Sequence, residues 1–462
     1  MSLFSLVDAF SPEITLSVGL LMMAIFVQKE KNKYWRIDLL YFITLVASLY
    51  ATKNYKAIPE YASLFSFSNE LLWLKRILLG LGVAAGSLIS IDAYKAKQEI
   101  FMLITASLIG ALLLVQSNHF FIFYLSIELM SLPIYALVAL SGQEHSGEAA
   151  IKYMLQGALV TSIFLFTLSF YYGVEANSFS FSDLRPLVFH ESPIQALTYA
   201  GLLGLILFKL GLFPFHYWVP DVYQQVRPSL IFFLVSIPKI AIIGLLFKIS
   251  GMLFNYVPLQ YVMTVISLLS AVLGSYASLQ QQSLQRLLGY ASIAQISWIL
   301  ASFSGGAIQS FAPILYYLMI YAVTMFCSVL ILITSFKNTV QIKINDLKEL
   351  VSYSPALTGL LCLLFISFAG IPPFPGFFAK FYIISGLLSN KSMMLGAFLL
   401  LLTGVSCAVY LRIILTFFKE TKLIEIKCID ETIETKRYIV LGVTAFLFVL
   451  IGLLPFSLFQ FF

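Results

Sequence analysis

The chain has 462 residues and a formal net charge of +6; 60% of its residues are hydrophobic and only 11% are charged. Soluble domains carry about 25% charged residues. This composition therefore excludes a soluble globular protein, whose surface it could not cover, and we expect the chain to lie in a lipid bilayer.

Apolar segments of about 18 residues or more recur along the whole chain, and each is long enough to cross a hydrocarbon core as a helix. They predict an all-α polytopic membrane protein with about 14 transmembrane helices. The expected spans are residues 12–28, 37–52, 72–91, 99–115, 118–139, 148–172, 195–216, 229–249, 257–279, 283–302, 308–334, 357–387, 394–417 and 438–459.

Acidic residues lie where a secretory signal would carry basic ones. Asp8 and Glu13 occupy that region, and no small-residue cleavage site follows them. We therefore expect the first helix to be retained.

Basic residues are distributed unevenly between the two sets of loops. If the N-terminus lies outside, inside loops hold 16 of the 28 Lys and Arg residues, and outside segments and helix ends hold seven, including Lys75 and Lys248. Lys and Arg are enriched in cytoplasmic loops. This predicts that both termini are periplasmic in a bacterial inner membrane. The net charge then follows from topology and gives no reason to expect nucleic acid.

Cysteine, histidine and glycine form no pattern typical of a metal, haem or nucleotide site. Gly80, Gly82 and Gly86 lie inside a predicted span without a preceding strand, which favours helix packing over a dinucleotide site. The four cysteines include no CxxC pair and belong to no His/Cys cluster with metal-ligand spacing; they are Cys327, Cys362, Cys407 and Cys428. We expect no metal and no cofactor on this chain.

Four ionisable residues lie deep in predicted spans: Glu128 in SIELMSL, Lys209 in ILFKLGLF, Lys239 in SIPKIAII and Lys380 in FFAKFYI. Such a residue at the centre of a spanning helix costs about 2.5 kcal/mol or more. Desolvation disfavours a charged lysine and a nearby carboxylate favours it, so a Glu–Lys pair of adjustable separation can switch a proton. We interpret these residues as an ion or proton path, with a structural role for each as the alternative.

Prolines predict helix breaks beside two of these lysines. Pro214 follows Lys209, and the prolines before Lys380 are Pro372, Pro373 and Pro375. Proline removes an amide donor, and the freed carbonyls need partners inside the protein or beside water when the helix lies in a bilayer. We predict that helices 7 and 12 are broken, with a packing kink as the alternative.

Spans four to eight and nine to thirteen can be aligned as two five-helix units. In each unit a lysine lies beside Pro-Phe in the fourth helix, and a basic residue, Lys239 or Arg412, recurs in the fifth. A unit with an odd number of spans is inverted when it repeats. The expected domains are 1–98 with helices 1–3, 99–250 and 251–420 as the two inverted units, and 421–462 with an inside loop and helix 14.

Three further positions have two interpretations each. Lys152 lies toward the inside end of its helix, where its stem can snorkel and where Glu148, four residues earlier, can pair with it. Arg412 also lies near an inside end, and snorkelling is the favoured interpretation. His216 ends the first broken helix. It is interpreted either as an interface histidine whose ring is satisfied by hydrogen bonds or as a proton carrier.

Several segments together resemble the antiporter-like membrane subunit family of the proton-pumping NADH:quinone oxidoreductase, respiratory complex I, in its subunit N branch. They are IELMSLPIYAL, GEAAIKYMLQGAL, KLGLFPFHYWVPDVYQQVRP, SIPKIA, QRLLGYASIAQ and AGIPPFPGFFAKFY. The PDVY segment points to subunit N over its larger relatives. The resemblance covers essentially the whole chain. It implies fourteen helices, outside termini and two inverted units.

The resemblance also implies roles for the buried charges. Glu128 and Lys209 match the Glu–Lys pair of the first half-channel, Lys239 the central relay residue, Lys380 the exit-side lysine and Lys152 an additional lysine.

The chain departs from the family pattern in two places. Gln295 stands where related sequences often carry His, so a histidine relay in that helix is not expected. Gln224 and Gln225 replace the usual Glu-Gly after PDVY, in an inside loop.

The predicted function is proton translocation by a membrane subunit of NADH:quinone oxidoreductase, driven by quinone reduction elsewhere in the complex. The resemblance implies that NADH, FMN, Fe–S clusters and quinone bind to other subunits, and that the partners are the other membrane subunits. The alternatives are a subunit of an Mrp-type sodium/proton antiporter, against which PDVY argues, a subunit of a membrane-bound hydrogenase, and a non-conducting scaffold.

Overall fold

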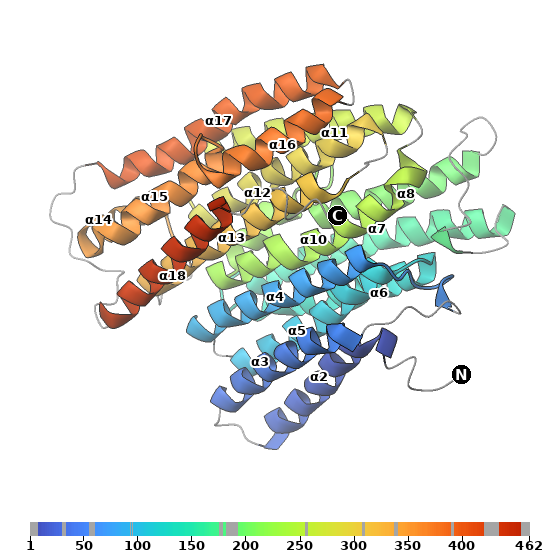
Figure 1. Ribbon diagram of the computed structural model, residues 1–462, viewed down its shortest axis with the longest axis horizontal. Coiled ribbons are helices and arrows are strands. Elements are labelled where there is room, and N and C mark those ends of the chain that lie inside the picture. Colours follow the sequence, from blue (N-terminus) through green and yellow to red (C-terminus); the bar gives the residue numbers. More distant parts are fainter. Residues whose placement is uncertain are drawn as a thin grey trace. The chain divides into compact units, whose positions relative to one another are not determined.

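The computed structural model describes residues 8–29, 34–54, 61–92, 94, 96–174, 179–181, 193–254, 257–306, 310–336, 341–389, 392–419 and 434–453. Within these ranges the chain is helical, as Figure 1 shows. The α-helices are α2 (Ser11–Lys29), α3 (Tyr34–Ala51), α4 (Asn69–Ile91), α5 (Lys97–Gln116), α6 (Phe120–Ala139), α7 (Ser146–Val174), α8 (Pro193–Leu210), α9 (Trp218–Gln225), α10 (Pro228–Leu253), α11 (Val257–Leu279), α12 (Leu284–Ala301), α13 (Ala312–Ser335), α14 (Lys348–Tyr353), α15 (Pro355–Ala369), α16 (Pro375–Ser389), α17 (Met393–Phe417) and α18 (Glu434–Leu453).

Most predicted spans coincide with one of these helices to within a few residues, and two are interrupted. The span predicted at 195–216 ends at Leu210, and a short helix, α9, follows at Trp218. The span predicted at 357–387 is divided into α15 and α16. The first interruption contains Pro214; the second contains Pro372 and Pro373, and Pro375 is the first residue of α16. The short helix α9 was not expected from the sequence.

Among the described residues, nine helices are long and apolar enough to cross a membrane: α4, α5, α6, α7, α10, α11, α12, α13 and α17. Shorter apolar segments lie in α2, α8, α15 and α18. The protein is an all-helical, polytopic membrane protein. Several expectations fall outside the described residues, namely Cys428 and most of the inside loop of 421–462.

The chain forms two compact units. The first comprises residues 1–90, 94–209 and 233–253, and the second residues 91–93, 210–232 and 254–462. In the first, α5 packs along α6, and α2 packs on α3 and α5. A Cβ atom at Gly110 would lie 2.4 Å from the backbone nitrogen of Met130, so glycine lets α5 approach the backbone of α6. Ser107 strengthens this contact by donating to the Met130 carbonyl at 2.9 Å.

In the second unit, α12 packs against both α11 and α9. A Cβ atom at Gly274 of α11 would lie 2.6 Å from the Ala294 nitrogen of α12. A Cβ atom at Gly289 of α12 would lie 3.1 Å from Pro220 Cα of α9. Helices α13, α15, α16 and α18 pack around one another in the same unit.

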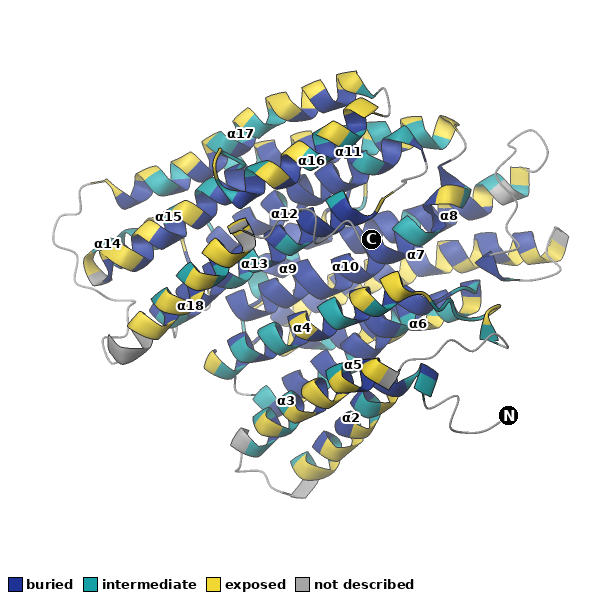
Figure 2. Ribbon diagram, in the orientation of Figure 1, coloured by how far each residue is buried: buried dark blue, intermediate teal, exposed yellow. Residues whose placement is uncertain are grey.

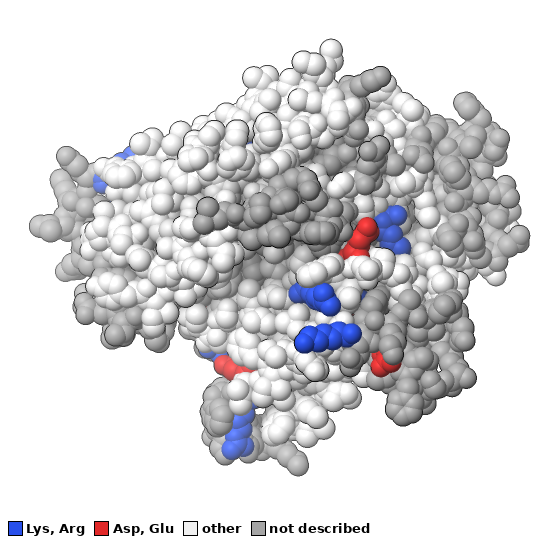
Figure 3. All heavy atoms as spheres, in the orientation of Figure 1, with Lys and Arg blue, Asp and Glu red and all other residues white. Residues whose placement is uncertain are grey.

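Burial differs sharply between helices. In the most apolar window of α10, 94% of residues are buried, and in that of α12 89%, whereas the value for α17 is 28% (Figure 2). Helices that are apolar on all sides belong inside a bundle. The exposed residues of α17 and α7 are themselves mostly apolar, and the face drawn in Figure 3 shows few charged side chains among the described residues. Such a surface suits contact with lipid or with other membrane subunits.

Candidate functional site

Lys209 lies one residue before the end of α8 and is 4% exposed. Its ammonium donates to the Ser131 hydroxyl at 2.7 Å and to the Tyr135 hydroxyl at 3.1 Å, both on α6. It also lies 5.5 Å from the centre of the Tyr135 ring. The lysine predicted to be deep is therefore buried and held by neutral oxygen atoms.

Glu128 shares a face of α6 with those two partners, because residues three and seven positions apart lie on one side of a helix. One carboxylate oxygen accepts a hydrogen bond from Thr161 of α7 at 3.1 Å. None of the described ion pairs joins Glu128 to Lys209. Glu128 therefore lies on the same face of α6 as Ser131 and Tyr135, the two residues that bind Lys209.

Lys239 follows Pro238 in α10 and is 1% exposed. Its helix is buried around its whole circumference, since almost every residue from Ser229 to Leu246 is buried. The prediction that Lys239 lies deep inside the protein agrees with this position.

Lys380 lies at the second helix break, on α16, and is 4% exposed. The last carbonyls of a helix have no partner within it. At the end of α15 the ammonium of Lys380 supplies these partners. It donates to the Ala369 carbonyl at 2.8 Å and to the Phe368 carbonyl at 3.4 Å. Gly370 follows with φ +84°, and a Cβ atom there would lie 2.8 Å from Lys380 Cδ. Glycine at position 370 therefore suits both the backbone conformation at the break and the close approach of the Lys380 side chain.

Gln295 joins the same group of atoms from α12. Its amide nitrogen donates to the Phe368 carbonyl at 3.1 Å, and its amide oxygen accepts from the Tyr317 hydroxyl. Gln295, Tyr317 and Lys380 line a cavity of about 10 Å³, roughly the space that one water molecule needs. The residue that replaces the family's frequent histidine thus lies beside the second break and contacts the carbonyl shared with Lys380.

The first break spans residues 211–217 and holds Pro214 and His216. Gly211 has φ +72°, and the Phe213 amide donates to Ser270 of α11 at 3.0 Å. The His216 ring is 7% exposed and stacks on Tyr217 with 4.3 Å between ring centres. The ring packs against aromatic side chains; both interpretations, a histidine with a satisfied ring and a proton carrier, stay predictions.

Lys152 differs from the three buried lysines. It forms an ion pair with Glu148 at 2.6 Å, and both side chains are more than half exposed. The expected pairing four residues apart is therefore present, on the surface of the chain near the start of α7.

Arg412 is partly buried on α17 and does not simply extend toward solvent. Its guanidinium donates to the Leu279 carbonyl at the end of α11. It thereby satisfies a carbonyl that the helix itself leaves without a partner.

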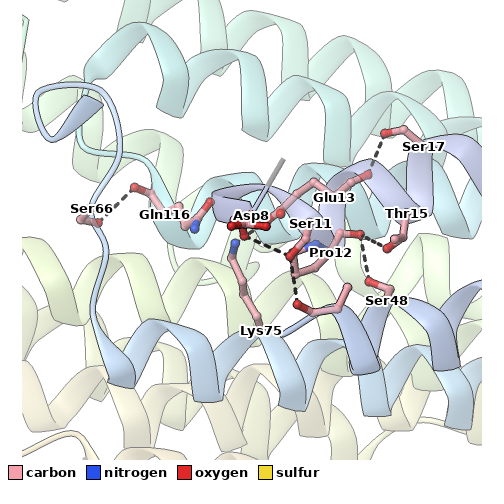
Figure 4. Close-up of polar contacts among 11 residues, drawn as sticks. Asp8, Ser11, Pro12, Glu13, Thr15, Ser17, Ser48, Ser66, Lys75 and Gln116 are labelled. Atoms are coloured by element: carbon pink, nitrogen blue, oxygen red, sulfur yellow. Dashed lines mark hydrogen bonds and ion pairs between the residues drawn. The ribbon is translucent and has the colours of Figure 1, made fainter. Parts of the chain in front are cut away.

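A buried ion pair that the sequence did not predict connects α2 and α4 (Figure 4). Lys75 Nζ lies 2.5 Å from Glu13 Oε1, and the side chains are 0% and 5% exposed. The sequence places Lys75 among the basic residues of outside segments and helix ends and predicts no partner for it. Arg76 is partly exposed and donates to the Thr52 hydroxyl at 3.1 Å. The residue before it, Lys75, points into the protein. The sequence feature that could have predicted this pair is Glu13, an acidic residue at the start of an apolar helix that needs a cationic partner if it is buried.

Hydroxyl groups fix the surroundings of that pair. Ser11 donates to the Ala51 carbonyl and Ser48 to the Pro12 carbonyl, each at 2.9 Å (Figure 4). Elsewhere in the described ranges, no group of three or more His, Cys, Asp or Glu side chains is placed to hold a metal ion.

Comparison with known proteins shows the family of this chain. Residues 117–409 match the family described as "NADH:quinone oxidoreductase/Mrp antiporter, TM". The NADH-quinone oxidoreductase subunit N of Acinetobacter baumannii is 32% identical over 71% of this chain and 68% of its own length. The chain belongs to the subunit N family of NADH-quinone oxidoreductase. The subunit N of Francisella tularensis subsp. holarctica is 28% identical over 96% of this chain and 95% of its own length.

Solved structures share the fold. A chain of respiratory complex I from Thermus thermophilus has a TM-score of 0.79 at 22% identity, covering 96% of this chain and 97% of that one. A chain of the Mrp complex from Dietzia has a TM-score of 0.78 at 19% identity, covering 93% and 83%. The predicted resemblance to the subunit N family is confirmed, and so is the function predicted at the level of that family, a proton-translocating membrane subunit of NADH:quinone oxidoreductase.

Proposed function

We propose that this subunit N family member moves protons through Glu128, Lys209, Lys239 and Lys380, with energy from quinone reduction on other subunits. The observation that carries this proposal is the near-complete burial of three lysines in an apolar helical bundle, at 4%, 1% and 4% exposure. Buried ionisable groups in spanning helices are costly, and they mark ion paths more often than packing contacts.

The contacts of these lysines suit proton exchange. Lys209 is bound to two hydroxyl groups, which can both donate and accept hydrogen bonds and so can serve either protonation state of the lysine. Lys380 is bound to backbone carbonyls beside a cavity of water size. Hydrogen bonds to neutral oxygen atoms hold the ammonium in place without the strong preference for the charged state that a paired carboxylate would impose.

The accessory roles follow from position. Lys152 with Glu148 would exchange protons at the surface of the first unit. His216 and Gln295 would support the helix breaks and their polar neighbours, and Arg412 would hold the end of α11. For Gln295 this role is a hydrogen-bonding one, because an amide does not titrate.

We also propose the finer architecture: fourteen crossings in two inverted five-helix units, with α8 and α9 forming helix 7, and α15 and α16 forming helix 12. Both termini would be periplasmic in a bacterial inner membrane. The partners would be the other membrane subunits of complex I, and NADH, FMN, Fe–S clusters and quinone would bind there and not to this chain. The domain division at 98, 250 and 420 belongs to the same proposal.

The test is Glu128→Gln, with Glu70→Gln as the matched control, because Glu70 is an exposed carboxylate in the first turn of α4. We expect NADH-driven proton uptake by inverted membrane vesicles to be lost in the first variant and retained in the second, at equal abundance of assembled complex. Normal proton uptake in an assembled Glu128→Gln complex would refute the proposed path.

The fold of the Dietzia Mrp chain supports one alternative, sodium/proton antiport. The two functions separate in vesicles that contain this chain with its natural partners. Proton movement that requires NADH and quinone supports the oxidoreductase subunit, whereas proton movement driven by a sodium gradient alone supports the antiporter.

A further inference from the structure

A basic pocket lies beside the C-terminal end of α17. Its volume is about 230 Å³. Three cationic side chains line it, Lys343, Arg412 and Lys419, together with the uncharged polar side chains of Gln282, Asn345 and Thr416.

The backbone around the pocket is held in place. The Ile344 amide donates to the Gln282 carbonyl and the Leu284 amide to the Ile342 carbonyl, each at 2.9 Å, so Lys343 projects from a short paired segment. Arg412 is anchored to the carbonyl of Leu279. The backbone that carries Lys343 and the guanidinium of Arg412 therefore have fixed positions before any ligand binds.

The positive charge of the pocket is not balanced by carboxylates. Within the described part of the chain, no ion pair involves Lys343, Arg412 or Lys419. Asp346 accepts from the backbone amide of Lys343 at 2.8 Å and does not line the pocket. An anion in this pocket would meet three cationic groups.

An apolar stripe runs along α17 next to the pocket. Leu411, Leu415 and Phe418 are 44%, 60% and 76% exposed; they follow one another at helical spacing. The neighbouring stripe of the same helix carries the pocket residues Arg412 and Thr416, and Lys419 follows just after the helix ends. The outward face of α17 is among the most exposed in Figure 2.

We propose that this pocket binds the phosphate headgroup of an anionic phospholipid, with its acyl chains along Leu411, Leu415 and Phe418. The cations and polar groups of the pocket can bind a phosphodiester, and the exposed apolar stripe beside them can pack against hydrocarbon chains. Basic pockets between transmembrane helices on the cytoplasmic side are a recurring site for anionic headgroups. The two lysines that the experiment changes, Lys343 and Lys419, have no role in the proposed proton path. Arg412, which has an accessory role there, is left unchanged, so the inference is tested separately from that path.

The experiment uses the whole purified complex in mild detergent. The probe is phosphatidylglycerol with a photoreactive diazirine in one acyl chain, and phosphatidylcholine with the same chain is the zwitterionic counterpart. Labelled peptides are mapped by mass spectrometry after chymotryptic digestion, which does not depend on lysine. The variants are Lys343→Gln, Lys343→Gln with Lys419→Gln, the charge-conserving pair Lys343→Arg with Lys419→Arg, and the control Lys348→Gln, a lysine of α14 that does not line the pocket.

We expect phosphatidylglycerol to label residues 411–418 of the wild-type chain. Each neutralised lysine should weaken this labelling about fivefold and the pair about 25-fold, while the arginine pair and Lys348→Gln retain it. Equal labelling by phosphatidylcholine, or unchanged labelling in the doubly neutralised variant, would overturn the proposal. Displacement of the probe by millimolar inorganic phosphate would also overturn it, because the pocket would then be a site for soluble anions.

Discussion

At the scale of single residues, Lys209 and Lys152 offer a direct comparison. Lys209 is buried and bound to Ser131 and Tyr135, whereas Lys152 is exposed and paired with Glu148. Lys209→Ala removes the cation that is bound on the Glu128 face of α6, so that carboxylate would tend to remain protonated. We expect proton uptake to fall about tenfold or more, equivalent to a barrier increase of about 1.4 kcal/mol. Lys152→Ala should remain near the wild-type rate.

Proton uptake in inverted vesicles at matched complex abundance measures both effects. Lys209→Arg is a useful third variant, because it keeps a positive charge that does not titrate. Loss of proton uptake in Lys209→Arg would show that position 209 must exchange a proton and not merely carry a positive charge. Equal losses in the two alanine variants would contradict the importance assigned to burial.

At the scale of helices, the contact between α15 and α16 sets the geometry of the second break. A Cβ atom at Gly376 would lie 1.8 Å from the Ser367 carbonyl oxygen, and the Gly376 amide donates to the Ser367 hydroxyl at 3.1 Å. Gly376→Ala should force α16 away from α15, at a cost of about 1–3 kcal/mol. Lys380, four residues later, would lose its carbonyl partners, and proton uptake should fall.

Gly359→Ala is the matched control, because a Cβ atom at Gly359 of α15 meets nothing within 4 Å. Alanine is the better helix former by about 1 kcal/mol, so this variant should assemble and function normally. If Gly376→Ala behaved as Gly359→Ala does, the close packing at the break would not matter for function.

The ion pair between α2 and α4 predicts a stability effect. Removing one partner of a buried pair leaves an uncompensated charge and costs about 3–5 kcal/mol. Lys75→Met should therefore lower the thermal stability and abundance of the complex, because Glu13 remains buried without its cation. Lys75→Met combined with Glu13→Gln should recover much of the loss. A double variant as unstable as the single one would show that the pair is needed as a pair.

At the scale of the whole molecule, the apolar segments predicted the helices well, because hydrophobic length is the dominant signal in a membrane chain. Prolines also located both breaks. The contacts of the site were less predictable. That Lys380 binds the carbonyls of Phe368 and Ala369, and that Gln295 shares one of them, depends on how three helices meet. The burial of Lys75 and its pairing with Glu13 were not predicted, because the sequence around Lys75 does not tell which face of α4 turns inward.

The orientation in the membrane gives the last prediction. The excess of basic residues in alternate loops places both termini outside, so the segment between α3 and α4 should face the periplasm and the segment after α11 the cytoplasm. Ser63 and Gln280 are exposed residues of these two segments. In a chain whose native cysteines are replaced, Ser63→Cys should react with a membrane-impermeant maleimide in cells with a permeabilised outer membrane. Gln280→Cys should react only after the inner membrane is opened. The reverse pattern would invert the topology, and with it the leaflet in which the basic pocket beside α17 lies.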